Sequence, residues 1–164
     1  MRVLQPLLCL LALLLGGCGN YDVTVNDRVV YTPEPLFTQF EIADTALRNC
    51  IRKAIEDGLV TAAGQLRAID CAGAGVANLQ GLATFTQIER LDLSSNSISD
   101  ISELGALTVL QALYLDHNRV VDAVPLYQLP TLHTLDLSAN PDLRCPASGS
   151  LVWVESLTLP RHCR

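Results

Sequence analysis

The sequence contains little lysine and few aromatic residues, and these shortages exclude several classes of function. Its 164 residues include one lysine, Lys53, and the formal net charge is −6. Because the chain has no basic patch, it lacks the electrostatic footprint of a nucleic-acid-binding protein. It also has no G-x-S-x-G, H-E-x-x-H or phosphate-binding loop, and no EF-hand pattern. The sequence thus indicates no catalytic site, no cofactor and no dedicated metal site.

A hydrophobic run long enough to cross a bilayer is missing as well. Residues 7–15 form a leucine-rich run, which is shorter than the roughly 20 apolar residues of a membrane span. The run follows Arg2 and precedes two glycines, which is the layout of a secretory signal peptide. We therefore assign residues 1–17 to a signal peptide, with a buried N-terminal helix as the alternative.

The end of this run, Leu15-Gly16-Gly17-Cys18, resembles the lipobox of bacterial lipoproteins. The resemblance implies cleavage before Cys18, lipidation of its thiol and usually acylation of the new amino group. Two or three acyl chains hold a protein firmly on a membrane, whereas one does not. The next residue is Gly19 rather than aspartate, which resembles the pattern of lipoproteins sent to the Gram-negative outer membrane. The sequence predicts an outer-membrane lipoprotein that faces either the periplasm or the cell surface.

A repeat of 22 residues organises the rest of the chain. Counted from Leu66, the first, fourth and sixth positions are apolar, and the ninth is asparagine in three successive coils. The fourth position reads Ile69, Leu91, Leu113, Leu135 and Leu157, and the ninth reads Ala74, Asn96, Asn118, Asn140 and His162. One coil cannot bury its own leucines, so the coils are expected to stack.

This L-x-x-L-x-L-x-x-N-x-L pattern resembles the leucine-rich-repeat family. The alternation at positions four and six predicts short strands with one buried face, stacked as a parallel sheet. The resemblance implies an α/β solenoid with 3₁₀ or extended segments on the convex side and a ladder of asparagines between coils. Within the family, residues 91–101 and the Pro125-Leu126 pair resemble internalin repeats, and the likeness covers roughly residues 37–163.

Both ends of such a solenoid would expose apolar core side chains to solvent, so each end needs a capping segment. Asp44 is expected to cap a helix that runs to about Asp57, with Gly58 after it, so residues 37–65 form a helical N-cap. Four coils then span residues 66–153, and residues 154–164 supply a fifth strand and a C-terminal cap.

Six cysteines occur, of which Cys9 lies in the signal peptide and Cys18 in the lipobox. The remaining four are Cys50, Cys71, Cys145 and Cys163. They allow three pairings and favour disulfides in an oxidising compartment. The repeat arrangement places Cys50 of the cap helix beside Cys71 of the first coil, and Cys145 near Cys163 at the other end. We therefore predict Cys50–Cys71 and Cys145–Cys163 bonds. The alternative is a metal site, and the lack of C-x-x-C spacing argues against it.

Residues 18–36, between the lipobox and the cap, have two interpretations. Residues 23–31 alternate partly around Asn26-Asp27, which predicts a small hairpin. Residues 32–35, with two prolines, break regular structure. A flexible tether between lipid and domain is the equal alternative.

The outward-facing strand residues form a polar and acidic concave face. The candidate partner-binding residues on it are Asp70, Asp92, Tyr114, Asp116, His117, His133 and Asp136. A tyrosine exposed at the centre suits an interface anchor, and the acidic charge favours a partner with basic residues. The alternative is that these polar side chains contact only solvent and bind no partner.

Together these observations predict an envelope-anchored lipoprotein that binds a protein partner through its concave face. One alternative is a purely structural envelope lipoprotein without a dedicated ligand. The other is a hydrolytic enzyme that uses the aspartates and histidines of the face. Carboxylates need an enclosed site to act as a matched acid and base, and an open sheet stays wet.

Overall fold

The computed structural model describes residues 22–26 and 28–163, and the chain divides into two units after Pro35. In the first unit, β1 (Val23–Val25) and β2 (Arg28–Tyr31) pair as an antiparallel hairpin, which is one of the two alternatives expected for this segment. The expected signal peptide and Cys18 lie outside the described residues. Within the described part of the chain, no helix has the length and hydropathy of a membrane span.

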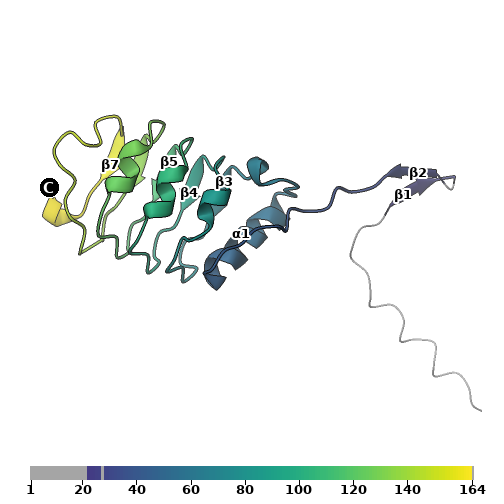
Figure 1. The fold of residues 1–164 in the computed structure, drawn as a ribbon, viewed down its shortest axis with the longest axis horizontal. Coiled ribbons are helices and arrows are strands. Elements are labelled where there is room, and N and C mark those ends of the chain that lie inside the picture. The colour runs from purple at the N-terminus through teal and green to yellow at the C-terminus, as the bar shows by residue number, and fades with distance from the viewer. Residues whose placement is uncertain (1–21, 27, 164) are drawn as a thin grey trace, which may run out of the picture. The chain divides into compact units, whose positions relative to one another are not determined.

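The second unit, Leu36–Arg164, contains a sheet of five short parallel strands that follow one another in chain order (Figure 1). The strands are β3 (Ala68–Asp70), β4 (Arg90–Asp92), β5 (Ala112–Tyr114), β6 (Thr134–Asp136) and β7 (Ser156–Thr158). Each residue pairs with the residue 22 positions further on, so that Leu91, Leu113 and Leu135 stand side by side. The predicted solenoid of stacked coils is confirmed.

Short 3₁₀ turns, rather than long helices, form the convex side of the coils, and they stack in a row (Figure 1). They span Leu82–Thr84, Ser102–Ala106 and Val124–Gln128. Leucines from the strands and the turns are fully buried between them, among them Leu113 and Leu104 at 0% exposure. Burial of each such side chain contributes roughly 1.5–3 kcal/mol, so this shared interior is the main source of stability.

The asparagines of the ninth position tie neighbouring coils together. Asn118 Nδ2 donates to the carbonyls of Leu93 (2.8 Å) and Leu115 (3.1 Å), and its Oδ1 accepts the N–H of Ile98 at 3.0 Å. Asn96 and Asn140 form the same type of bonds in their coils. Backbone groups of the buried turns are thereby paired, which avoids a large desolvation cost.

The residue before each of these positions has a left-handed backbone. Its φ is +62° at Gly73, +56° at Ser95, +54° at His117 and +53° at Ala139. Such a conformation costs a residue other than glycine roughly 1–2 kcal/mol. The chain thus tolerates local strain in order to turn off each strand, and the position of His117 is set by this turn.

Helix α1 (Thr45–Asp57) packs against β3 and covers the first edge of the sheet. Asp44 caps it, with Oδ1 accepting the N–H of Leu47 at 3.0 Å. Oδ2 of the same carboxylate accepts the N–H groups of Ala77 (2.9 Å) and Asn78 (3.1 Å) in the first coil. Burial raises the pKa of Asp44, but these backbone hydrogen bonds outweigh that effect and hold it below its ordinary value. One side chain thus joins the cap to the repeats.

Two further features fasten this cap. The Cys50–Cys71 disulfide links α1 to the first coil, with a Cα–Cα distance of 5.8 Å. The three phenylalanines of the chain, Phe37, Phe40 and Phe85, pack together with ring centroids 5.5–6.1 Å apart. The cap is therefore held by a covalent bond, an aromatic cluster and the Asp44 carboxylate.

The end of α1 differs in detail from the expectation. Gly58 is the C-cap residue, but its φ of −88° is right-handed, and the left-handed residue is Leu59, with φ +50°. The N–H of Val60 bonds to the carbonyl of Ile55, and that of Leu59 to Glu56. These bonds form a Schellman motif whose left-handed position falls one residue after the glycine.

The C-terminal end of the solenoid also differs from the expectation. The repeat register predicts a core position for Leu157, but this side chain is 38% exposed. In the described residues β7 pairs with β6 alone, so nothing stacks on its other side. The predicted Cys145–Cys163 bond is present, with a Cα–Cα distance of 5.2 Å, and links the final turn to the loop that precedes β7.

Candidate functional site

Five side chains line up across the middle of the sheet, one from each strand. The register places side by side Asp70, Asp92, Tyr114, Asp136 and Thr158. Neighbouring strands lie about 4.8 Å apart, so Tyr114 on the central strand lies between Asp92 and Asp136. All three side chains are half-buried, while the leucines beside them in the strands point into the core. The repeat therefore builds an aromatic group flanked by two carboxylates.

The aspartates of this column also shape the backbone. One oxygen of Asp70, Asp92 and Asp136 accepts the N–H of the residue two positions later, at 3.1, 3.0 and 2.8 Å. Such bonds stabilise turns, and they direct the chain off each strand. Each aspartate therefore has a local structural role in addition to the charge that it places on the concave face.

Arg90 packs on the ring of Tyr114. Its guanidinium carbon is 4.9 Å from the ring centroid, and Nη1 donates to the tyrosine hydroxyl at 3.4 Å. This cation–π contact reaches from β4 to β5. Tyr114 is thus not the freely exposed anchor expected from the sequence, because it is half-buried and one face of its ring is covered.

Sequence reasoning did not include Arg90 among the candidate binding residues. The repeat geometry could have indicated this contact. Arg90 is at the third position of its coil, and this position is diagonal to the fifth position of the next coil, which Tyr114 occupies. Long side chains reach across such diagonals in a sheet. The pair also places one positive charge among the aspartates of the face.

Asp116 and His117 form the next part of the site. Nδ1 of His117 lies 2.9 Å from Oδ2 of Asp116, and the two side chains are 68% and 24% exposed. They lie just after β5, and Leu115 separates Asp116 from Tyr114. Asp92, Tyr114 and Asp136 are therefore neighbours across the sheet, and the paired Asp116 and His117 lie in the turn that follows β5.

Two of the predicted residues lie at the margins of this group. Asp70 is on the edge strand β3, separated from Tyr114 by β4. His133 is exposed and precedes β6, so it lies at the opposite end of the strands from the turn that holds His117. These residues belong to the concave face but not to its centre.

The arrangement offers little support for hydrolysis. Asp92 and Asp136 lie two strands apart, about 9.6 Å, and Tyr114 occupies the strand between them. Acid–base chemistry also needs an enclosed site, whereas these two carboxylates are half-buried side chains on one face of the sheet.

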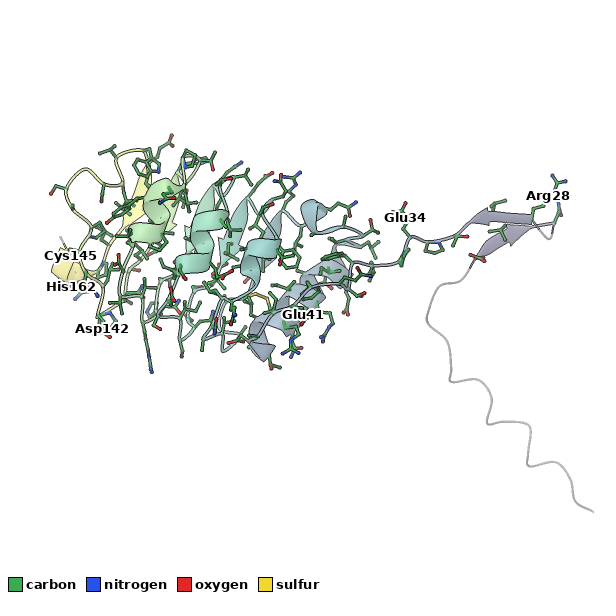
Figure 2. All side chains as sticks on the ribbon, viewed as in Figure 1. Arg28, Glu34, Glu41, Asp142, Cys145 and His162 are labelled. Carbon is green, nitrogen blue, oxygen red and sulfur yellow. A yellow bond between two sulfur atoms is a disulfide. The ribbon has the colours of Figure 1, made fainter. Side chains whose placement is uncertain are left out.

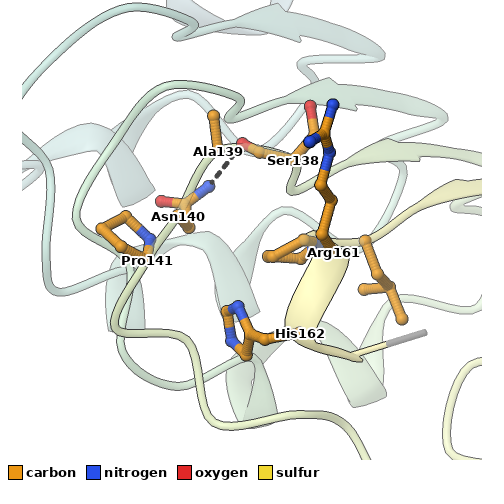
Figure 3. Close-up of a pocket in the computed structure, with 8 residues that line it drawn as sticks. Ser138, Ala139, Asn140, Pro141, Arg161 and His162 are labelled. Atoms are coloured by element: carbon orange, nitrogen blue, oxygen red, sulfur yellow. Dashed lines mark hydrogen bonds between the residues drawn. The ribbon is translucent and has the colours of Figure 1, made fainter.

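A shallow pocket of about 550 Å³ lies where the last two strands turn toward the convex side (Figure 3). Its lining residues are Ser138, Ala139, Asn140, Pro141, Leu159, Pro160, Arg161 and His162. Arg161 supplies the one permanent charge among them. The pocket adjoins the C-terminal disulfide rather than the acidic centre of the face.

The 22-residue register, the asparagine ladder and the convex 3₁₀ turns together decide the class of the fold. The chain has the leucine-rich-repeat fold. The sequence profile described as Leucine Rich Repeat matches residues 87–107. No curated protein matches this leucine-rich-repeat chain significantly.

Solved structures of Listeria monocytogenes internalins resemble the leucine-rich-repeat chain. An internalin (inlF) is 30% identical, with a TM-score of 0.63 over 72% of this chain and 36% of that one. Internalin C2 is 23% identical, with a TM-score of 0.60 over 71% of this chain and 53% of that one. The functional domain of InlJ, which includes a cysteine ladder, is 20% identical, with a TM-score of 0.54 over 71% and 31%.

The chain therefore spans between about a third and a half of the length of these internalins. The likeness establishes the repeat architecture and the helical N-terminal end. Leucine-rich-repeat domains generally mediate protein–protein contacts, with the specificity held in exposed residues. The two disulfides are typical of proteins outside the cytoplasm.

Proposed function

We propose that this chain binds a protein partner through its concave face, centred on Tyr114. One observation carries the proposal: Asp92 and Asp136 flank an aromatic ring that Arg90 holds in place. The surrounding sheet is rigid because its leucines are buried between stacked coils. A preordered surface loses little conformational entropy when it binds, which favours recognition.

The chemistry of the face specifies the kind of partner. Asp92 and Asp136 flank Tyr114, Asp116 follows it in the turn after β5, and Arg90 contacts its ring. A lysine or arginine of the partner would meet these carboxylates and the edge of the ring. The net charge of −6 also steers a basic partner toward the chain.

A purely structural role is the second candidate, and one observation favours it. Asp70, Asp92 and Asp136 each hold a turn through a backbone hydrogen bond, which accounts for these residues without any ligand. The two candidate functions differ in one respect: binding through the concave face requires the negative charge of the aspartates, and the structural role requires only their hydrogen-bonding oxygen.

Asparagine substitutions separate these candidates. In the Asp92→Asn/Asp136→Asn variant, the side-chain oxygen that accepts the turn hydrogen bond remains while both charges are removed. Binding through the face predicts at least a tenfold fall in partner recovered by affinity capture from the native envelope. The free energy of unfolding should stay within about 0.5 kcal/mol of the parent.

The convex side provides a matched control. Asp100 and Asp122 accept the N–H groups of Ser102 and Val124, both at 2.9 Å, so they have the same turn role on the other side of the coils. Asp100→Asn/Asp122→Asn should leave partner recovery unchanged. Equal recovery from both double variants would reject the concave-face proposal and leave the structural role.

We also propose that Cys18 is lipidated and anchors the chain to the outer membrane. This proposal rests on the lipobox resemblance of residues 15–18. Cells fed labelled palmitate should incorporate label into the parent but not into a Cys18→Ala variant. Protease treatment of intact cells then distinguishes a surface-facing domain, which is degraded, from a periplasmic one, which is protected.

A further inference from the structure

Three ligand-type side chains meet at the C-terminal cap, away from the concave-face centre. Ligand atoms of Cys145, His162 and Cys163 all lie within 4.8 Å of one another. The two cysteines are joined as a disulfide, and His162 directly precedes Cys163 on the final turn, Arg161–Cys163. Figure 2 shows Cys145 and His162 close together at this end of the solenoid.

The imidazole of His162 is oriented by a backbone carbonyl. Its Nε2 lies 2.9 Å from the oxygen of Leu143. A carbonyl oxygen accepts hydrogen bonds but cannot donate them, so Nε2 is the donor and, in the neutral ring, Nδ1 has the lone pair. A hydrogen bond from the second ring nitrogen to a carbonyl is the usual support of a metal-ligating histidine. His162 is therefore prepared to act as a ligand through Nδ1.

We propose that reduction of the Cys145–Cys163 disulfide converts this cap into a Zn²⁺ site. A dithiol reductant supplies two electrons and two protons, and the sulfur–sulfur bond becomes two thiols while the dithiol becomes its own disulfide. Zn²⁺ then displaces both thiol protons to solvent and binds the two thiolates and Nδ1 of His162. Water completes a tetrahedral Cys₂His site, a ligand set known for zinc.

The geometry requires only a small rearrangement. Bonds of about 2.0–2.3 Å to a tetrahedral zinc ion place its ligand atoms about 3.3–3.8 Å apart. The two sulfur atoms must separate once their bond is broken, and the ring nitrogen of His162, which now lies within 4.8 Å of both sulfurs, must approach them by about 1.5 Å or less. Cys145 and His162 are exposed, and His162 also lines the pocket of Figure 3, so solvent and reductant reach the site.

The other disulfide supplies an internal contrast. Cys71 is 2% exposed and lies in the core beneath α1. Among the described residues, the Cys50–Cys71 pair belongs to no cluster of three potential ligands. Conversion to a metal site is thus specific to the C-terminal end.

Metal titration of the purified full chain tests the proposal. The chain is reduced without oxygen, freed of reductant and titrated with Zn²⁺, or with Co²⁺ as a spectroscopic probe. The reduced chain should bind one equivalent and show thiolate-to-cobalt charge-transfer absorption. The oxidised chain should show neither. A reduced chain that binds no metal would overturn the proposal.

Variants assign the ligands. Cys50→Ser/Cys71→Ser should retain the binding, and Cys145→Ser/Cys163→Ser should lose it. His162→Gln keeps a polar side chain beside Leu143 but lacks the imidazole, and it should bind at least tenfold more weakly. Circular dichroism of each reduced variant, the form that is titrated with metal, verifies that the coils are folded. Metal binding that survives in Cys145→Ser/Cys163→Ser, or unchanged affinity in His162→Gln, would contradict the assignment.

Discussion

The first strand of the sheet is covered, whereas the last strand is open. Ile69 of β3 is 2% exposed beneath helix α1, and the equivalent Leu157 of β7 is 38% exposed. The disulfide at the first end includes the buried Cys71, while the one at the other end includes the exposed Cys145. The same repeat position thus has two different environments at the two ends.

The difference shows that burial in a solenoid depends on the neighbouring coil. Each coil contacts only its neighbours, so stability is approximately a sum of local terms. The last coil has one neighbour among the described residues, and it should open more readily than the first. Tyr114 lies on β5, which β6 separates from the last strand, so fraying of β7 does not reach it directly.

Glycine substitutions should give the largest contrast between the ends. A Cβ at Gly81 (φ +95°) would overlap the carbonyl oxygen of Glu41 in the N-terminal cap, whereas Gly149 (φ +90°) has only Val152 nearby, at 3.9 Å. Gly81→Ala should cost about 2–5 kcal/mol, and Gly149→Ala about 1–2 kcal/mol. Urea unfolding measures both, and equal losses would mean that the two ends are packed alike.

Truncation of equivalent core residues should sharpen the same contrast. Ile69→Ala removes a buried side chain and should cost about 2–4 kcal/mol. Leu157→Ala should cost about 1 kcal/mol, because much of that side chain already contacts water. Thermal unfolding of the two variants gives the comparison, and a larger loss for Leu157→Ala would contradict an open C-terminal strand.

Acid should weaken the N-terminal end selectively. The folded-state pKa of Asp44 lies below its ordinary value of 3.8, so its contribution is complete above that pH and is lost as the pH falls further. Asp44→Asn should cost about 1–2 kcal/mol at pH 7 and flatten the decline of stability below pH 3.8. Asp142→Asn at the other end should cost less than about 0.5 kcal/mol. Urea unfolding at several pH values measures the free energy of unfolding of each variant. If stability falls with decreasing pH as steeply in Asp44→Asn as in the parent, Asp44 is not the group responsible.

Relief of left-handed strain should have the smallest effect and should be similar at both ends. Leu59 and Ala139 have φ values of +50° and +53°. Replacing either with glycine should raise the free energy of unfolding by about 0.5–1 kcal/mol, since the removed strain exceeds the added chain entropy. Calorimetry of Leu59→Gly and Ala139→Gly provides the measurement, and destabilisation of both would show that the turns are unstrained.

The solenoid could be predicted from the sequence because one 22-residue register determines the position of every strand. An uninterrupted 22-residue spacing aligns Leu91, Leu113 and Leu135 before any tertiary detail is known. The pairing Cys50–Cys71 followed from the same register, because it places the helix on the first coil. The exposure of Leu157 was not predictable from the pattern alone, since burial depends on a neighbour that the pattern does not specify.

The candidate site was predicted in position but not in detail. The repeat identified Asp92, Tyr114 and Asp136 as one column. It did not reveal the contact of Arg90 with the tyrosine ring, because that contact joins residues 24 positions apart on a diagonal. Nor did it reveal the hydrogen bonds that the aspartates make to their own turns, which depend on side-chain rotamers.

Photocrosslinking in the cells that produce the protein tests the central claim most directly. A benzophenone placed on the ring of residue 114, in a Tyr114→benzoylphenylalanine variant, would project from the middle of the concave face. The same group at Val124, which is 52% exposed on the convex side, serves as the control. The account predicts a covalent adduct with one partner protein from position 114 and none from position 124. The absence of an adduct at 114, or equal adducts at both positions, would contradict it.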